Sequence, residues 1–88
     1  MELEEIQQIL IDRDFVGGTI FENPSYCTAF LGVTEEGQLV YSYEKMIEFL
    51  VKEDNMTEEE AIEFIDYNTL RTIPYMGSLH PIIVYDLK

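Results

Sequence analysis

The chain has 88 residues, enough for one domain, and we expect residues 1–88 to fold as a single unit. Eighteen Asp and Glu oppose five Lys and Arg, giving a formal net charge of −13. This balance argues against direct binding to nucleic acid or to an anionic membrane, because both depend on Lys and Arg. The single cysteine argues against a disulfide framework and a cysteine-based zinc site. The lone thiol and the acidic start of the chain predict a cytoplasmic protein.

The first elements in chain order are a helix and a loop. Apolar residues at positions 3, 6 and 10 recur at helical spacing, and acidic residues fill the first turn, so residues 2–12 are predicted to be an amphipathic helix. Gly17-Gly18 breaks this pattern. The segment 13–24 is predicted to be a loop or an irregular edge strand that closes on the turn signal Asn23-Pro24.

A hairpin is predicted next. Residues 26–33 form the first strand, with Cys27, Ala29, Leu31 and Val33 pointing one way. Both faces of this strand are apolar, so we expect it to be covered on both sides and Cys27 to be a buried, inert thiol. The connection 34–37 ends in Gly, and residues 38–41 return as the second strand.

Two helices follow the hairpin. Ser42 is predicted to cap a helix over residues 43–54, whose apolar stripe is formed by Tyr43, Met46, Ile47 and Leu50. Thr57 and Glu60 form a capping box for a second helix, which runs from 58 to about 68 or one turn further. Ile62, Ile65 and Thr69 mark its buried face, and Pro74 and Gly77 end any continuation.

A last strand over residues 82–85 completes the order α-β-β-α-α-β. The predicted fold class is therefore α+β, with a small three-stranded, mainly antiparallel sheet packed with about three helices. The order of the strands in the sheet does not follow from the sequence.

Candidate chemistry is sparse. The single histidine, His80, precedes Pro81 and has no Ser or Cys partner identifiable from the sequence. The residues after Asp54 depart from the calcium-loop pattern, and no glycine loop of the phosphate-binding type is present. We therefore predict a protein that is not an enzyme, with no catalytic residue, cofactor or metal.

The acidic residues of the two central helices form the first candidate site. Glu44 and Glu48 lie four apart on one helix, and Glu59, Glu63 and Asp66 line one face of the next. Carboxylates at this spacing rise about 6 Å along a helix, whereas phosphates of one DNA strand rise about 3.4 Å each. Two adjacent helices would thus imitate a phosphate backbone sparsely. The alternative is a solvated surface that serves only solubility.

The segment 67–77 forms the second candidate site, because it interleaves aromatic and polar residues around a proline. We expect Phe49, Phe64, Tyr67 and Tyr75 to pack in the core, with the connection pinned by hydrogen bonds from Asn68 and Arg71. The alternative is a binding surface formed by Tyr67, Arg71 and Tyr75, since Tyr and Arg are favoured at interfaces.

The stretch from Met56 to Arg71, followed by Ile73-Pro74-Tyr75-Met76-Gly77 and residues 81–85, resembles short acidic proteins encoded by bacteriophages and prophages of gut Firmicutes. The likeness covers roughly residues 34–87. This family is uncharacterised and supplies no catalytic residue. The resemblance implies a viral protein made inside a bacterial host.

Two function classes follow. The first is an inhibitor or modulator, similar to an anti-CRISPR protein, whose acidic surface occupies the basic nucleic-acid site of a host protein such as a Cas nuclease. The second is an interaction module or homodimer that binds through the Tyr67–Tyr75 surface without mimicry. An enzyme is the least favoured alternative.

Overall fold

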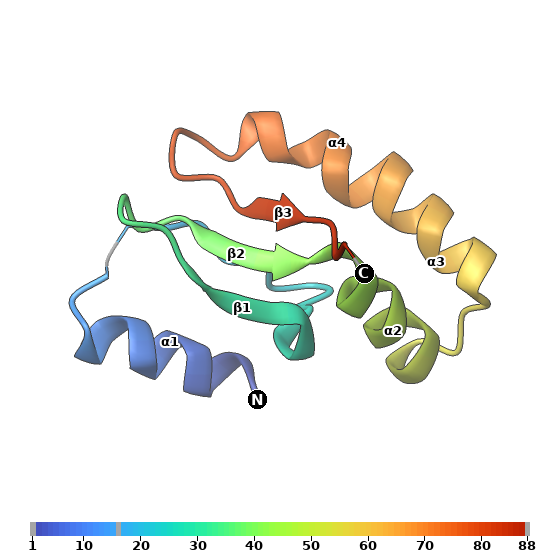
Figure 1. Ribbon diagram of the computed structural model, residues 1–88, viewed down its shortest axis with the longest axis horizontal. Helices are drawn as coiled ribbons and strands as arrows, with labels where there is room; N and C mark the ends of the chain where they lie inside the picture. The colour runs from blue at the N-terminus through green and yellow to red at the C-terminus, as the bar shows by residue number, and fades with distance from the viewer. Residues whose placement is uncertain (1, 16, 88) are drawn as a thin grey trace.

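A computed structural model of the protein describes residues 2–15 and 17–87 and confirms the predicted α+β fold. The predicted order of helices and strands is also confirmed. In chain order the helices and strands are α1 (Leu3–Asp12), β1 (Phe30–Val33), β2 (Leu39–Ser42), α2 (Tyr43–Glu53), α3 (Glu58–Phe64), α4 (Leu70–Thr72) and β3 (Ile82–Val84). In the view of Figure 1, α1 lies below the sheet, and the long helix that contains α3 and α4 lies above it.

The sheet is mixed, in the order β1-β2-β3. β1 and β2 pair antiparallel, as predicted for the hairpin, with Val33 opposite Leu39. β3 pairs parallel to β2, with Val40 opposite Ile82, so the expectation of a mainly antiparallel sheet is only half right. The reason is the crossover: the chain runs through the helices between β2 and β3, and such a connection returns a strand in the same direction.

The predicted strand 26–33 is wrong in its first half. Cys27–Ala29 form a 3₁₀ turn, entered by Tyr26 in a left-handed conformation (φ 49°), and the strand begins only at Phe30. The register of β1 then shifts between Phe30 and Gly32. Because of these two irregularities, Cys27 and Leu31 do not share a face: the first is buried, as expected for an inert thiol, and the second is half exposed.

Both predicted helix caps are present. The Ser42 hydroxyl oxygen accepts a hydrogen bond from the backbone N–H of Lys45 at 3.3 Å and starts α2. The Thr57 hydroxyl oxygen accepts from the N–H of Glu60 at 3.1 Å, and a Glu60 carboxylate oxygen accepts from the N–H of Thr57 at 2.9 Å. These bonds satisfy N–H groups that a helix start otherwise leaves free.

The helix that begins at α3 continues about one turn past residue 68, as the longer of the two predicted ends has it, but it is not uniform. It continues through a π-helical segment, Ile65–Thr69, then α4, and ends in a 3₁₀ turn, Ile73–Tyr75. Pro74 lies at the start of that last turn, where its missing N–H costs nothing, so it does not end the helix earlier. Gly77, with φ of +92°, provides the left-handed residue that redirects the chain.

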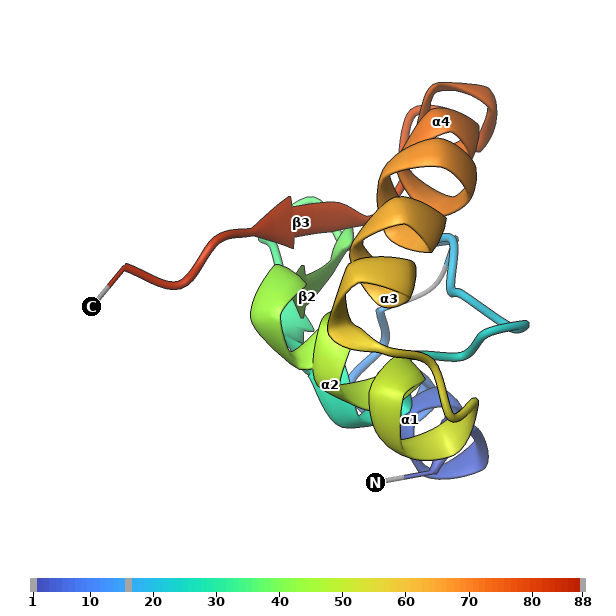
Figure 2. The same cartoon turned by 90° about the vertical axis from the view of Figure 1, so that its right-hand side faces the viewer.

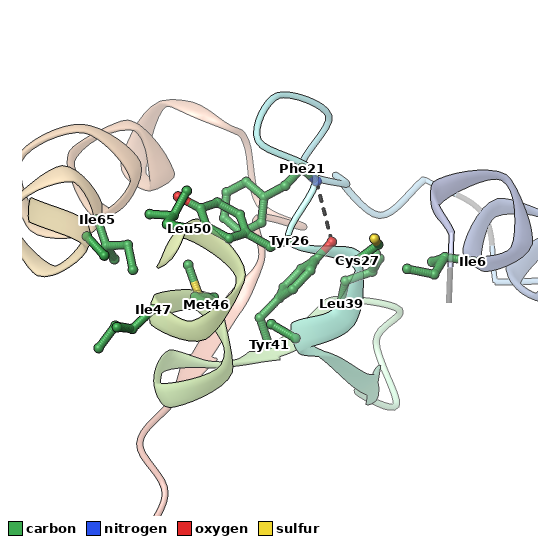
Figure 3. Close-up of a cluster of buried hydrophobic side chains, with 12 residues drawn as sticks. Ile6, Phe21, Tyr26, Cys27, Leu39, Tyr41, Met46, Ile47, Leu50 and Ile65 are labelled. Carbon is green, nitrogen blue, oxygen red and sulfur yellow. Dashed lines mark hydrogen bonds between the residues drawn. The ribbon is translucent and has the colours of Figure 1, made fainter. Parts of the chain in front are cut away.

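The core lies between the inner face of the sheet and the helices. Figure 3 shows Tyr41 of β2 between Leu39 on one side and Met46, Leu50 and Ile65 on the other, all fully buried or nearly so. The outer face of the sheet, which carries Val40 and Ile82, has no described helix over it (Figures 1 and 2). In the part of the chain that the structure describes, no helix is both long enough and apolar enough to cross a bilayer.

Candidate binding surface

The acidic residues predicted as a site lie on the solvent side of two helices in contact. Glu44 and Glu48 are exposed on α2, Glu59 and Glu63 are exposed on α3, and Asp66 is exposed in the π-helical segment. α2 and α3 pack against each other through their apolar faces. The expected exposure of all five carboxylates is therefore confirmed.

One hydrogen bond joins the two acidic helices. The Tyr43 hydroxyl, at the start of α2, donates to a carboxylate oxygen of Asp66 at 2.9 Å. Partial burial of the Tyr43 ring, the bond to Asp66 and the negative charges of Asp66 and Glu44 together raise the pKa of Tyr43 to about 12. The negative charges of Asp66, which follows α3, and of Glu44, on α2, thus both act on the Tyr43 hydroxyl.

The π-helical segment was not predicted. The backbone N–H of Leu70 donates to the carbonyl of Ile65, five residues earlier, which places one extra residue in the turn. Ile65 and Thr69 are buried, whereas Tyr67 and Asn68 point to solvent. Single π-helical turns are rare and frequent at functional sites. The apolar spacing 62, 65, 69 fits an ordinary helix, so the sequence contains no signal for the extra residue.

The aromatic residues of this region divide into two groups. Phe49 and Phe64 pack against the core, as expected. Tyr67 and Tyr75 do not: 61% and 89% of their surfaces are exposed, so the expectation that they are core residues is wrong. Tyr67 lies opposite the buried Ile65 on the helix, which places its ring in solvent.

The guanidinium of Arg71 stacks on the exposed ring of Tyr67. The guanidinium carbon lies 5.2 Å from the ring centre, within the range of a cation–π contact. The expected pinning bonds from the Asn68 and Arg71 side chains do not form within the described residues. The connection is held instead by Thr72, whose hydroxyl donates to the Thr69 carbonyl at 2.7 Å, and by Thr19, whose hydroxyl donates to the Met76 carbonyl at 3.1 Å.

Two adjoining hollows flank the π-helical segment. The inner hollow, of about 260 Å³, lies between this segment and the loop before β1. The outer hollow, of about 460 Å³, lies on the solvent side of α3. Phe64 and Asn68 line both. Sequence reasoning missed these hollows because the loop at residues 20–24 meets residues more than 40 positions away, and no local pattern signals that contact.

The groups with reactive chemistry are dispersed. Among residues 2–15 and 17–87, no three His, Cys, Asp or Glu side chains cluster in a way that could hold a metal ion. Cys27 is buried. The ring nitrogen Nδ1 of His80 lies 2.9 Å from the carbonyl oxygen of its neighbour Pro81. The feature with the clearest chemical character is therefore the acidic surface with its adjoining hollows.

The chain matches no protein-family model, no curated protein and no solved structure. The resemblance to phage proteins remains a prediction, and the function has to be argued from the surface itself.

Proposed function

We propose that the protein is a non-enzymatic binding protein that modulates a basic host protein in the bacterial cytoplasm. Its acidic surface, formed by Glu44, Glu48, Glu59, Glu63 and Asp66, would occupy a site where that partner binds nucleic acid, for example in a Cas nuclease. The observation that carries the proposal is the Tyr43–Asp66 hydrogen bond, because it brings Asp66, which follows α3, to the start of α2, where Glu44 lies.

The charge of the chain supports this partner chemistry. A net charge of −13 on 88 residues produces a strong negative potential that steers a basic partner toward the protein. Like charges at helical spacing cost a few tenths of a kcal/mol per pair. This repulsion between carboxylates on two neighbouring helices is relieved when the surface binds Lys and Arg side chains of a partner.

The test is a charge-neutral triple variant, Glu59→Gln, Glu63→Gln and Asp66→Asn. Lysate proteins are captured on the immobilised protein as salt rises from about 50 to 200 mM, the range over which phosphate-type contacts weaken, and duplex DNA is added as competitor. We expect the variant to keep its melting temperature, to capture less and to lose part of its salt dependence. DNA should displace the partner captured by the unmodified protein.

The matched control removes three charges elsewhere, by Glu4→Gln, Glu35→Gln and Glu36→Gln. These residues are exposed on α1 and in the β1–β2 turn. If control and test variants capture equally, the binding depends on total charge and the helical surface is only solvated.

A second candidate function is self-association or partner binding through Tyr67, Arg71 and Tyr75. The exposure of both tyrosine rings favours it. Sedimentation of the protein at rising concentration tests it: a dimer that disappears in Tyr75→Ser supports this function, and a monomer at all concentrations rejects self-association.

A further inference from the structure

We infer that the two hollows beside the π-helical segment together bind a short peptide segment of the partner, one that carries an Arg or Lys next to a large apolar residue. This inference rests on the proposed function and assigns the part of the partner that is recognised. The groove is defined by the outer hollow, the inner hollow and the residues they share, Phe64 and Asn68.

The outer hollow has the chemistry of a guanidinium or ammonium site. Two carboxylates, those of Glu60 and Glu63, line it together with the ring of Tyr67. No Lys or Arg is among its described lining residues. Arg71 already stacks on the Tyr67 ring, which shows that this ring accepts a guanidinium. A second cation in the hollow would gain the carboxylate of Glu63 and the second oxygen of Glu60, whose first oxygen caps α3, and bonds between charged groups are the stronger ones.

The inner hollow has the chemistry of an apolar pocket. Phe21, Phe64 and Met76 contribute to its lining. Its hydroxyl groups are engaged: those of Tyr26 and Thr69 bond to each other at 2.6 Å, and that of Thr72 donates to the Thr69 carbonyl at 2.7 Å. The other polar side chains of its lining, Glu22, Asn23 and Asn68, are exposed to solvent. Because the hydroxyls are already satisfied, they offer little to a polar ligand group, whereas an apolar side chain gains from burial.

The position of the hollows favours an elongated ligand. Both are lined by Phe64 and Asn68 and therefore adjoin, so neighbouring side chains of one short segment can enter both. Charge excludes a second copy of this chain as the preferred occupant, because each copy carries a net charge of −13. A basic partner meets no such repulsion. The acidic lining of the outer hollow favours the same kind of partner.

The experiment uses the full chain and synthetic peptides. The probe is Gly-Ser-Arg-Phe-Arg-Ser-Gly, and the comparison peptides replace Phe by Ser or both Arg by Glu. Binding is followed by amide chemical shifts in NMR spectra. We expect the probe to shift the amides of Glu63, Asn68 and Thr72, and the comparison peptides to bind at least about tenfold more weakly, as expected when a buried apolar group or a charged bond is lost.

Two variants of α3 provide a matched pair. Glu63→Gln and Glu58→Gln remove the same charge from exposed positions of one helix, but only Glu63 lines the outer hollow. Glu63→Gln should weaken binding of the probe by about tenfold, and Glu58→Gln by less than about twofold, since a separated surface charge is screened by salt. Asn68→Trp fills the groove from an exposed position and should abolish the shifts without lowering the melting temperature.

Several results would overturn the inference. Equal binding of the Arg-Ser-Arg peptide, or equal effects of Glu58→Gln and Glu63→Gln, would mean that charge alone is recognised. The groove is then wrong, while docking through the acidic surface stands. Absence of binding by every peptide also rejects the groove, and the lysate capture decides the proposed function independently. Shifts at the same amides when the protein alone is concentrated would assign the groove to a second copy.

Discussion

The bond between the hydroxyls of Tyr26 and Thr69 provides a sharp test of how the π-helical segment is held. Both side chains are buried and the two oxygens lie 2.6 Å apart. Tyr26→Phe removes one hydroxyl and leaves the other buried without a partner, which costs about 1–3 kcal/mol. A domain of this size has about 4–13 kcal/mol of stability in total, so the loss corresponds to a fall in melting temperature of at least about 4 °C.

The assay is a double-mutant cycle by denaturant titration. Thr69→Val should cost a similar amount for the same reason, but the double variant leaves no unpaired hydroxyl, so its cost should fall short of the sum by at least about 1 kcal/mol. Thr28→Val, at an exposed threonine two residues after Tyr26, is the control and should change stability by less than about 0.5 kcal/mol. Additive costs within about 0.3 kcal/mol would refute the claim that this bond anchors the segment.

Four further outcomes are expected. Thr57→Ala removes the capping box and should cost about 1 kcal/mol in thermal melts; an unchanged midpoint would show that the cap contributes nothing. Ile65→Ala truncates a fully buried side chain and should cost about 2–5 kcal/mol in a denaturant titration, whereas a loss below about 0.5 kcal/mol would place it at the surface. Gly18→Ala would place its Cβ against a backbone carbonyl oxygen of the β1–β2 turn and should lower the melting temperature. Gly32→Ala has open space around the added carbon and should leave the melting temperature unchanged. Equal melting temperatures of the two variants would contradict this. Burial raises the pKa of Tyr41 from 10.0 to about 12, so between these pH values the folded protein keeps a proton that the unfolded chain loses. The free energy of unfolding should therefore be constant below about pH 10 and fall as the pH rises toward 12. Tyr41→Phe should reduce this fall in a denaturant titration across that range.

The helices and the hairpin turn were predictable because their signals are local. A cap such as Thr57 with Glu60, or an apolar stripe at helical spacing, acts within one or two turns of chain. The strand at 26–33 failed because its residues are apolar on both faces, so their spacing could not reveal the 3₁₀ turn at Cys27–Ala29. The parallel direction of β3 depends on the path of the connecting helices, which is set by packing over long distances.

The sequence predicts which residues of the candidate site are exposed, but neither the π-helical segment nor the hollows. Exposure of Glu44, Glu63 and Asp66 follows from their helical spacing, since the apolar stripe defines the opposite face. Tyr67 lies opposite Ile65 in the same helix, so its exposure also agrees with the spacing, and the expectation of a core position rested on its aromatic character alone. The π-helical segment was not predictable, because it contacts a residue far away in sequence through the bond between Thr69 and Tyr26. The hollows likewise need the loop at residues 20–24 to be brought beside the helix by the tertiary fold.

The parallel β2–β3 pair also has a consequence for how the chain folds during synthesis. Residues 82–84 leave the ribosome after β1, β2 and the helices that follow β2, yet they complete the sheet on the free side of β2. The hairpin and helices can form early from neighbouring residues, whereas this pairing must close the whole interval 43–81 and should be the slow step. Until it is made, the backbone groups of Val40 to Ser42 on that side lack their strand partner. A chain cut short before residue 82 would therefore be the form most prone to pair with other unfinished chains.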